Sequence, residues 1–151
     1  MSRFRILVAD QAEAIFYDAA VMGRRPKEVA RLSDPVAHLH DRDLVTDRPG
    51  RAFDRFGGGR HSLEEENDAR FQEAVKFAKR IARRLDEARR HGEFDELIVV
   101  AGPPFLGLVR KALSKPTREL VVREIHKDLV HSPVDTLVEH LPASNEELRP
   151  G

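Results

Sequence analysis

Leu97-Ile98-Val99-Val100-Ala101 is a continuous apolar run, and Gly102-Pro103-Pro104 follows it directly. An apolar run without alternating polar residues is typical of a β-strand that is covered on both faces. We therefore expect this run to be a strand at the centre of the sheet. Glycine and proline are the strongest local signals of a turn, so the strand should end at Gly102.

The residues after this turn predict a βαβ unit. Phe105 to Leu113 is expected to form a short helix with apolar residues on one side and basic residues on the other, and Glu119 to Ile125 is rich in leucine and valine, as a strand would be. Ser132 suits the N-cap of a last helix, with Pro133 at the first helical position. Pro142 should end that helix.

The residues before the central run predict three antiparallel strands. Phe4 to Ala9 is an apolar run, and Ala14 to Tyr17 begins a second one so soon afterwards that a hairpin is the natural connection. Lys27 to Ser33 alternates polar and apolar residues, which is the pattern of a half-buried strand.

A long helix is expected from Ser62 onward. Ser62 and Glu65 have the spacing of a capping box, with Asn67 or Asp68 as alternative caps, and the acidic residues around them suit the positive end of a helix dipole. Gly92 favours the end of the helix. A stripe with a 3.6-residue period runs along it through Phe71, Ala74, Val75, Ala78, Ile81, Ala82, Leu85 and Ala88.

Length and composition indicate one domain. A chain of 151 residues can bury a single core, so we expect one domain over residues 1–142 and a frayed tail over 143–151. The chain has 26 basic and 26 acidic residues, so any anion site must be local. It has no cysteine, which excludes disulfides, thiolate metal sites and cysteine nucleophiles.

The N-terminus, Met1-Ser2-Arg3-Phe4-Arg5, leads directly into an apolar run that is too short for the core of a signal peptide. No stretch approaches the ~20 apolar residues that a helix needs to span a bilayer. We therefore expect a soluble, cytoplasmic protein without a membrane partner. The sequence leaves its oligomeric state open.

Residues 34–61 show no sustained periodicity and are expected to form a long loop, which in a compact domain is either functional or disordered. The predicted order of elements is βββ-loop-αβαβα. This order describes an α/β (α+β) domain with a mixed sheet.

A basic, glycine-rich segment lies within the predicted loop. One interpretation is a flexible tip, and the other is a loop that faces a ligand, because guanidinium groups bind phosphate and glycine lets a strand of nucleic acid approach the backbone. The candidate RNA-binding residues in this segment are Arg48, Arg51, Arg55, Gly57, Gly58, Gly59, Arg60 and His61.

The middle of the predicted helix is a basic ridge that could extend this site. The alternative interpretation is a solvated face that serves only solubility. The ridge consists of Lys76, Lys79, Arg80 and Arg83, with Arg84 beside them.

The histidines of the loop suggest a third class of function, a metal-dependent hydrolase, because imidazole and carboxylate are ordinary metal ligands. This signal is weak, and solvated loop histidines are the simpler interpretation. Lys127-Asp128 follows a strand where α/β folds often place functional residues, but an ion pair or a helix cap would fit equally well. The candidate metal ligands are His38, His40, Asp41, Asp43 and His61.

An ordered set of short motifs follows the three-strand start: Asp34-Pro35, Arg48-Pro49-Gly50-Arg51, Gly58-Gly59-Arg60-His61, Phe77-Ala78, Val99-Val100-Ala101-Gly102-Pro103-Pro104 and Lys127-Asp128-Leu129. From about Phe4 to Leu141 the chain thereby resembles the bacterial host attachment protein family. That family is similar to the middle domain of archaeal and eukaryotic peptide-chain release factors. In those factors a Gly-Gly-Gln loop reaches the peptidyl-transferase centre of the ribosome.

This resemblance implies a release-factor-like domain that binds the ribosome or tRNA through Gly57, Gly58 and Gly59. The glutamine of the release factors is absent, since Gly59 or Arg60 stands in its place. Arginine accepts no hydrogen bond, so we expect RNA binding without peptide release and without a cofactor. The alternative is a protein-interaction or regulatory module with an indirect role in attachment to host cells.

Overall fold

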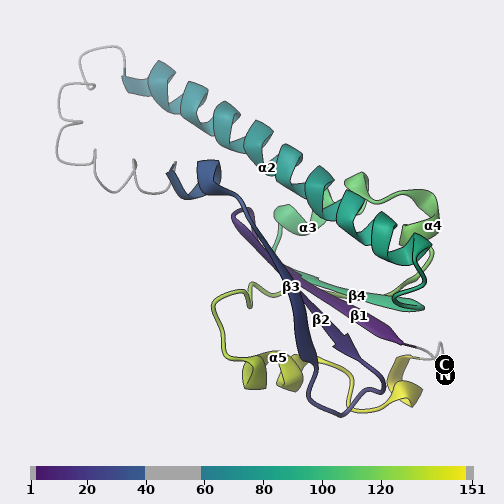
Figure 1. Cartoon of the computed structure of the whole chain (residues 1–151). Helices are drawn as coiled ribbons and strands as arrows, with labels where there is room; N and C mark the ends of the chain where they lie inside the picture. The colour runs from purple at the N-terminus through teal and green to yellow at the C-terminus, as the bar shows by residue number, and fades with distance from the viewer. Residues whose placement is uncertain (1–2, 40–58, 149–151) are drawn as a thin grey trace.

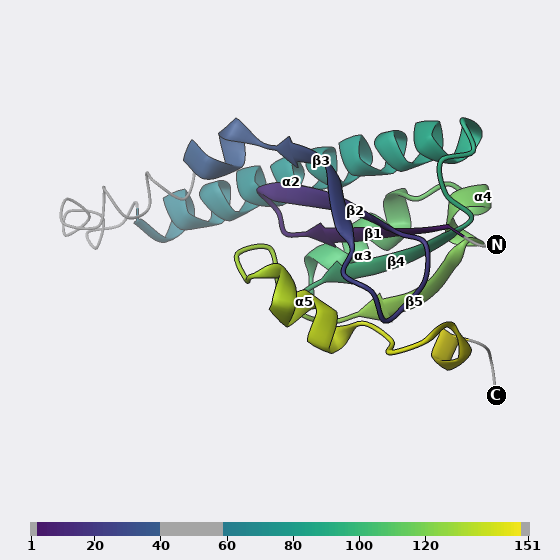
Figure 2. The ribbon, with the colours of Figure 1, turned by 60° about the horizontal axis from the view of Figure 1, so that its bottom comes forward.

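The computed structural model describes residues 3–39 and 59–148, with the backbone alone for residues 59–62. A five-stranded mixed sheet, in the order β3-β2-β1-β4-β5, forms the middle of three layers. Helices α2 and α3 cover one face of the sheet and α5 lies on the other (Figures 1 and 2). The predicted single α/β domain with a mixed sheet is therefore confirmed.

The first three strands are antiparallel, as the sequence predicts. β1 (Phe4–Ala9) pairs with β2 (Glu13–Ala19), and β2 pairs with β3 (Lys27–Ser33). The predicted strand at Leu97–Ala101 is β4 (Glu96–Ala101), and all five of these residues are buried. β4 lies parallel to β1 on one side and to β5 (Val121–Ile125) on the other. β4 is therefore an interior strand of the sheet, as predicted, and the middle strand of the five is β1.

One face of the sheet packs against the long helix α2 (Gly59–Arg90) and α3 (Phe105–Ala112). The apolar stripe of α2 enters this core from Ala74 onward, whereas Phe71 is 54% exposed. The N-terminal half of α2 extends beyond the sheet (Figure 1). The largest fully buried side chains on this face are Leu7, Phe16, Phe77, Ile81, Leu85, Leu97 and Val99.

The opposite face of the sheet packs against α5 (Val134–His140) and the segment before it. Strand side chains alternate between the two faces, so residues 4, 6 and 8 of β1 enter this core. Pro133 is the N-cap of α5, so the predicted helix begins one residue later than expected. The members of this core include Phe4, Ile6, Val8, Ile15, Ile98, Val100, Leu129 and Leu137.

A short helix that the sequence analysis missed, α4 (Lys115–Arg118), connects α3 to β5. It is tied to α2 by Asp86, which accepts hydrogen bonds from the hydroxyls of Ser114, at 2.6 Å, and Thr117. Burial alone would raise the pKa of Asp86, but these hydrogen bonds and the nearby arginines of α2 outweigh it and leave the pKa below its ordinary value.

Both ends of the predicted loop are helical where the structure describes them. Residues 35–39 form a short helix, with Asp34 Oδ1 accepting a hydrogen bond from the backbone of Val36 as an N-cap. The long helix begins at Gly59 rather than at Ser62, because the acidic residues that suggest its first turn lie one turn further in. Gly92, with φ of +69°, follows its end as predicted.

Residues 143–148 do not form the expected frayed tail. They contain a 3₁₀ helix, η2 (Asn145–Leu148), which is held against the body of the domain. The backbone N–H of Met22 donates to Asn145 Oδ1 at 2.8 Å, and Arg123 Nη2 donates to the carbonyl of Glu147 at 2.8 Å. Leu148 also packs against the core on the α5 side of the sheet.

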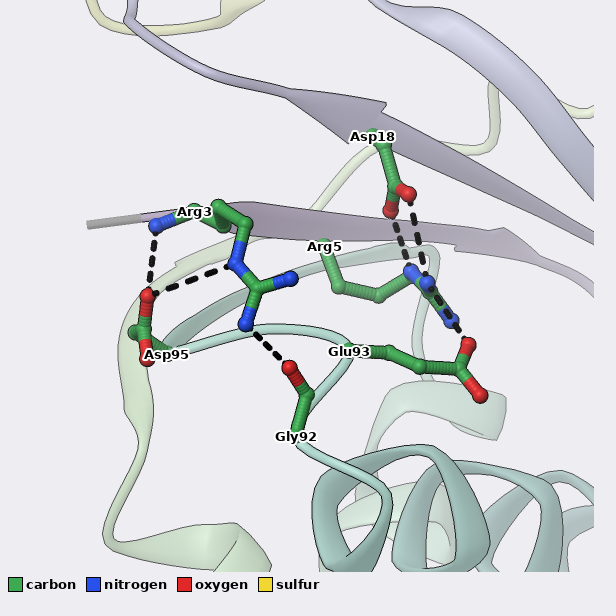
Figure 3. A network of polar contacts seen from close by, with 6 residues as sticks. All are labelled: Arg3, Arg5, Asp18, Gly92, Glu93 and Asp95. Carbon is green, nitrogen blue, oxygen red and sulfur yellow. Dashed lines mark hydrogen bonds and ion pairs between the residues drawn. The ribbon is translucent and has the colours of Figure 1, made fainter. Parts of the chain in front are cut away.

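Two arginines, Arg3 and Arg5, form ion pairs and hydrogen bonds at the start of β1 (Figure 3). Arg5 is only 5% exposed, and it pairs with Asp18 at 2.5 Å and with Glu93 at 3.2 Å. Arg3 donates to the carbonyl of Gly92. An unpaired buried charge is strongly destabilising, so both carboxylates are needed around Arg5. The pair with Asp18 lies within the sheet, and the pair with Glu93 joins the segment after α2 to it.

Candidate functional site

The glycine-rich segment falls mostly outside the described residues. Arg48, Arg51, Arg55, Gly57 and Gly58 lie there, as do the candidate metal ligands His40, Asp41 and Asp43. Gly59, Arg60 and His61 form the first residues of α2, so they belong to a helix rather than to a loop. The predicted contact between this segment and RNA therefore stays a prediction.

The predicted basic ridge divides into two groups. Lys76, Lys79 and Arg83 form what we call the outer face of α2, because they point away from the stripe that enters the core. All three are exposed, and no salt bridge involves them within residues 3–39 and 59–148. With a rise of 1.5 Å per residue, they cover about 10 Å along the helix.

Arg80 and Arg84 belong to the second group, because their guanidinium groups lie over the sheet side of α2. Arg80 donates from Nη1 to the carbonyl of Ser33 at 3.3 Å, and its guanidinium carbon is 5.4 Å from the centre of the Phe77 ring. The guanidinium of Arg84 lies 6.0 Å from the ring of Phe16. These contacts join α2 to β2 and β3, so the guanidinium groups of Arg80 and Arg84 are engaged within the domain.

A cavity of about 430 Å³, which the sequence analysis missed, opens at the carboxyl ends of the parallel strands. Asp10 follows β1, Gly102 follows β4, and Asp128 and His131 lie beyond β5. In α/β sheets, ligands bind outside the carboxyl ends of strands. In the sequence, the cavity is marked only by a polar residue or a glycine directly after each predicted strand. This pattern indicates a shared site only when the strands are known to be adjacent.

The cavity holds carboxylates and imidazoles close to one another. Asp10 Oδ1 accepts hydrogen bonds from the backbone N–H groups of Ala12 and Glu13, each at 2.8 Å. Asp10 Oδ2 lies 3.6 Å from Nε2 of His131. Beside the cavity, the carboxylate of Glu13 is 3.9 Å from His131 and 3.9 Å from His38.

A remaining part of the lining is apolar. Pro103 and Pro104, joined by a cis peptide bond, lie next to Phe105, whose ring is 6.1 Å from that of Phe77. No group of three or more histidine, aspartate or glutamate side chains within the described part of the chain has the arrangement of a metal site. Of the candidate metal ligands, His38 lines this cavity. The cavity therefore offers hydrogen-bond acceptors beside an apolar wall.

No helix in the described residues is long and apolar enough to cross a membrane. The model of a family described as proteins required for attachment to host cells matches residues 5–141. An uncharacterized protein of Rickettsia prowazekii (strain Madrid E) is 42% identical over 45 residues, which are 30% of this chain and 30% of that relative. The family match covers most of the chain, so this chain belongs to the family of proteins required for attachment to host cells.

Proposed function

We propose, from this membership, that the chain is a protein-interaction or regulatory module that attachment to host cells requires. The observation that carries the proposal is the extent of the family match, which includes all five strands and the helices on both faces of the sheet. Its proposed role is indirect, in the cytoplasm, and not that of the adhesin.

The outer face of α2 is the proposed contact surface for the partner. Lys76, Lys79 and Arg83 are exposed on one side of a rigid helix, whereas the neighbouring arginines are occupied by contacts within the domain. Cations on a rigid element steer an oppositely charged partner and fix its orientation. The partner that fits is a protein with an acidic surface.

Deletion of the gene in its own organism tests the proposed role. The deletion strain should attach less to host cells, and the wild-type gene supplied in trans should restore attachment. Cell fractionation should recover the protein with the cytoplasm. Undiminished attachment of the deletion strain would contradict the proposed requirement for attachment. Recovery of the protein at the cell surface would contradict the proposed indirect role in the cytoplasm.

The second candidate is a release-factor-like domain that binds the ribosome or tRNA without releasing peptide. The observation that favours it is the same trio of exposed cations on a helix that directly follows the glycine-rich segment. Cations in this arrangement can neutralise neighbouring phosphates. Gly59 or Arg60 stands in place of the release-factor glutamine, and neither side chain can accept a hydrogen bond from a hydrolytic water.

Sedimentation with ribosomes in cell extract tests this candidate. The wild-type chain should move with ribosomes at low salt. The matched variants are Lys76→Ala/Lys79→Ala/Arg83→Ala and the control Lys27→Ala/Lys111→Ala/Lys115→Ala, which removes three exposed cations elsewhere. Sedimentation that both variants retain, or that wild type lacks, argues against the RNA candidate.

A further inference from the structure

We propose that the cavity at the carboxyl ends of β1 and β4 binds an organic cation, an ammonium or guanidinium group attached to an apolar stem. This site goes beyond the proposed function, because none of its residues belongs to the outer face of α2. The shared chemistry could come from a basic side chain of a peptide or from a free amine, and the probes below separate these sources.

The charge of the cavity determines the sign of the ligand. Asp10 and Asp128 line it, Glu13 lies beside it, and no lysine or arginine is among its described lining residues. The imidazoles of His38 and His131 line the cavity as well, 3.6–3.9 Å from the carboxylates of Asp10 and Glu13. An anionic ligand would therefore meet these carboxylates with no lysine or arginine beside them. A guanidinium or ammonium group would instead form charge-assisted hydrogen bonds, which are about twice as strong as neutral ones.

The position of Asp10 is set before any ligand arrives. Its Oδ1 atom accepts two backbone hydrogen bonds at 2.8 Å inside the β1–β2 turn, and the backbone N–H of Asp10 donates to the carbonyl of Glu13 at 2.9 Å. The carboxylate therefore loses little rotamer freedom on binding. Its Oδ2 atom makes no hydrogen bond within the described residues and lies 3.6 Å from His131 Nε2.

The second carboxylate, that of Asp128, belongs to the segment that packs against the end of β4 at Gly102. A β-carbon at this position would lie 3.4 Å from the β-carbon of Asp128 and 3.7 Å from its backbone nitrogen. These distances are ordinary van der Waals contacts, so the segment after β5 lies directly against the end of β4. Asp10 and Asp128, which are far apart in the sequence, become two acceptors of one cavity.

The apolar part of the lining is suited to contact an apolar stem of the ligand. Ala12, Pro103 and Phe105 line the cavity next to the two aspartates. Its volume of about 430 Å³ lies within the ordinary range for small-ligand sites, which is roughly 300–1,000 Å³. A methylene chain against this wall with its charged end between the aspartates satisfies both parts of the lining.

The test is a titration of the ¹⁵N-labelled full chain followed by NMR. The probes are Nα-acetyl-arginine amide, its neutral isostere Nα-acetyl-citrulline amide, and putrescine. The arginine probe should cause saturable shifts at the backbone amides of Gln11, Ala12 and Gly102, and the citrulline probe should not. Tighter binding of putrescine than of the arginine probe supports the cation site and assigns a free amine as its source.

Two variants and a control make the test specific. Asp10→Asn removes the charge but keeps an oxygen for the two backbone hydrogen bonds, so the turn should survive, and binding should weaken at least tenfold. Asp128→Asn should weaken binding to a similar extent, whereas Glu139→Gln, an exposed acid on α5, should leave it unchanged. A dispersed spectrum verifies that each variant is folded.

Three results would overturn the proposal. The first is equal binding of the arginine and citrulline probes, and the second is unchanged binding by Asp10→Asn and Asp128→Asn. The third is a response to zinc chloride alone, at equimolar metal, combined with no response to any amine or guanidinium probe. None of these results depends on attachment or on ribosomes, so failure here is distinguishable from failure of the proposed function.

Discussion

The salt dependence of RNA affinity shows whether the outer face of α2 binds phosphate. The perturbation is the triple variant Lys76→Ala/Lys79→Ala/Arg83→Ala. Each cation that neutralises a phosphate of single-stranded RNA contributes roughly 0.7 to the slope of log affinity against log salt, so three contacts contribute about 2. A fourfold rise in salt then costs the wild type about 20-fold more affinity than the variant.

The assay is RNA and ribosome binding of wild type and variant across a salt series. Alanine has the highest helix propensity and these side chains are exposed, so the variant should unfold at about the wild-type temperature. The control Lys27→Ala/Lys111→Ala/Lys115→Ala removes the same charge from β3, α3 and α4 and should keep the wild-type slope. An unchanged slope in the α2 variant would show that the outer face of α2 contacts no phosphates, because counterion release depends on the number of phosphates contacted.

Three further predictions concern the contacts that hold the domain together. Arg84→Ala should lower the free energy of unfolding by about 0.5–1 kcal/mol through loss of the contact with the Phe16 ring, with no change in the salt slope of RNA binding; denaturant titration measures the first quantity. Asp86→Ala should lower the free energy of unfolding by about 1–3 kcal/mol at pH 7, through loss of charged hydrogen bonds to α4. Because the pKa of Asp86 is lowered in the folded state, this contribution is complete above its ordinary value of 3.8 and is lost as the pH falls through the folded pKa, so acid titration of stability should show wild type and variant converging. Gly23→Ala should destabilise the domain by more than about 1–2 kcal/mol, since φ is +93° there and a β-carbon would lie 2.5 Å from the carbonyl oxygen of Ala143. Limited proteolysis should then cut residues 143–148 sooner than in wild type, and equal cleavage of the two proteins would contradict the packing of this segment.

Patterns local in the sequence predicted most of the secondary structure. The run Leu97–Ala101 is a strand covered on both faces, and the 3.6-residue stripe of α2 is buried from Ala74 onward except at the half-buried Val75. Strand order was not predictable in the same way. Phe4–Ala9 is buried along its whole length too, and only the pairing partners determine that β1 rather than β4 is in the middle.

The division of the basic ridge depends on residues far away in the sequence. A helical projection places Arg80 on the solvent side with Lys76 and Lys79. The structure differs because a long guanidinium side chain can fold back, and the carbonyl of Ser33 lies within its reach. The cavity was missed for a related reason, since Asp10 and Asp128 meet only after three parallel strands are aligned.

Attachment to host cells tests most directly whether the outer face of α2 carries the function. The deletion strain is complemented with each of two variants at equal protein levels, and attachment is measured. Lys76→Ala/Lys79→Ala/Arg83→Ala removes the outer face of α2, and Lys27→Ala/Lys111→Ala/Lys115→Ala removes the same charge elsewhere. We expect the control to restore attachment and the α2 variant to leave attachment at the level of the deletion strain. Full restoration by both variants would contradict the assignment of function to the outer face of α2.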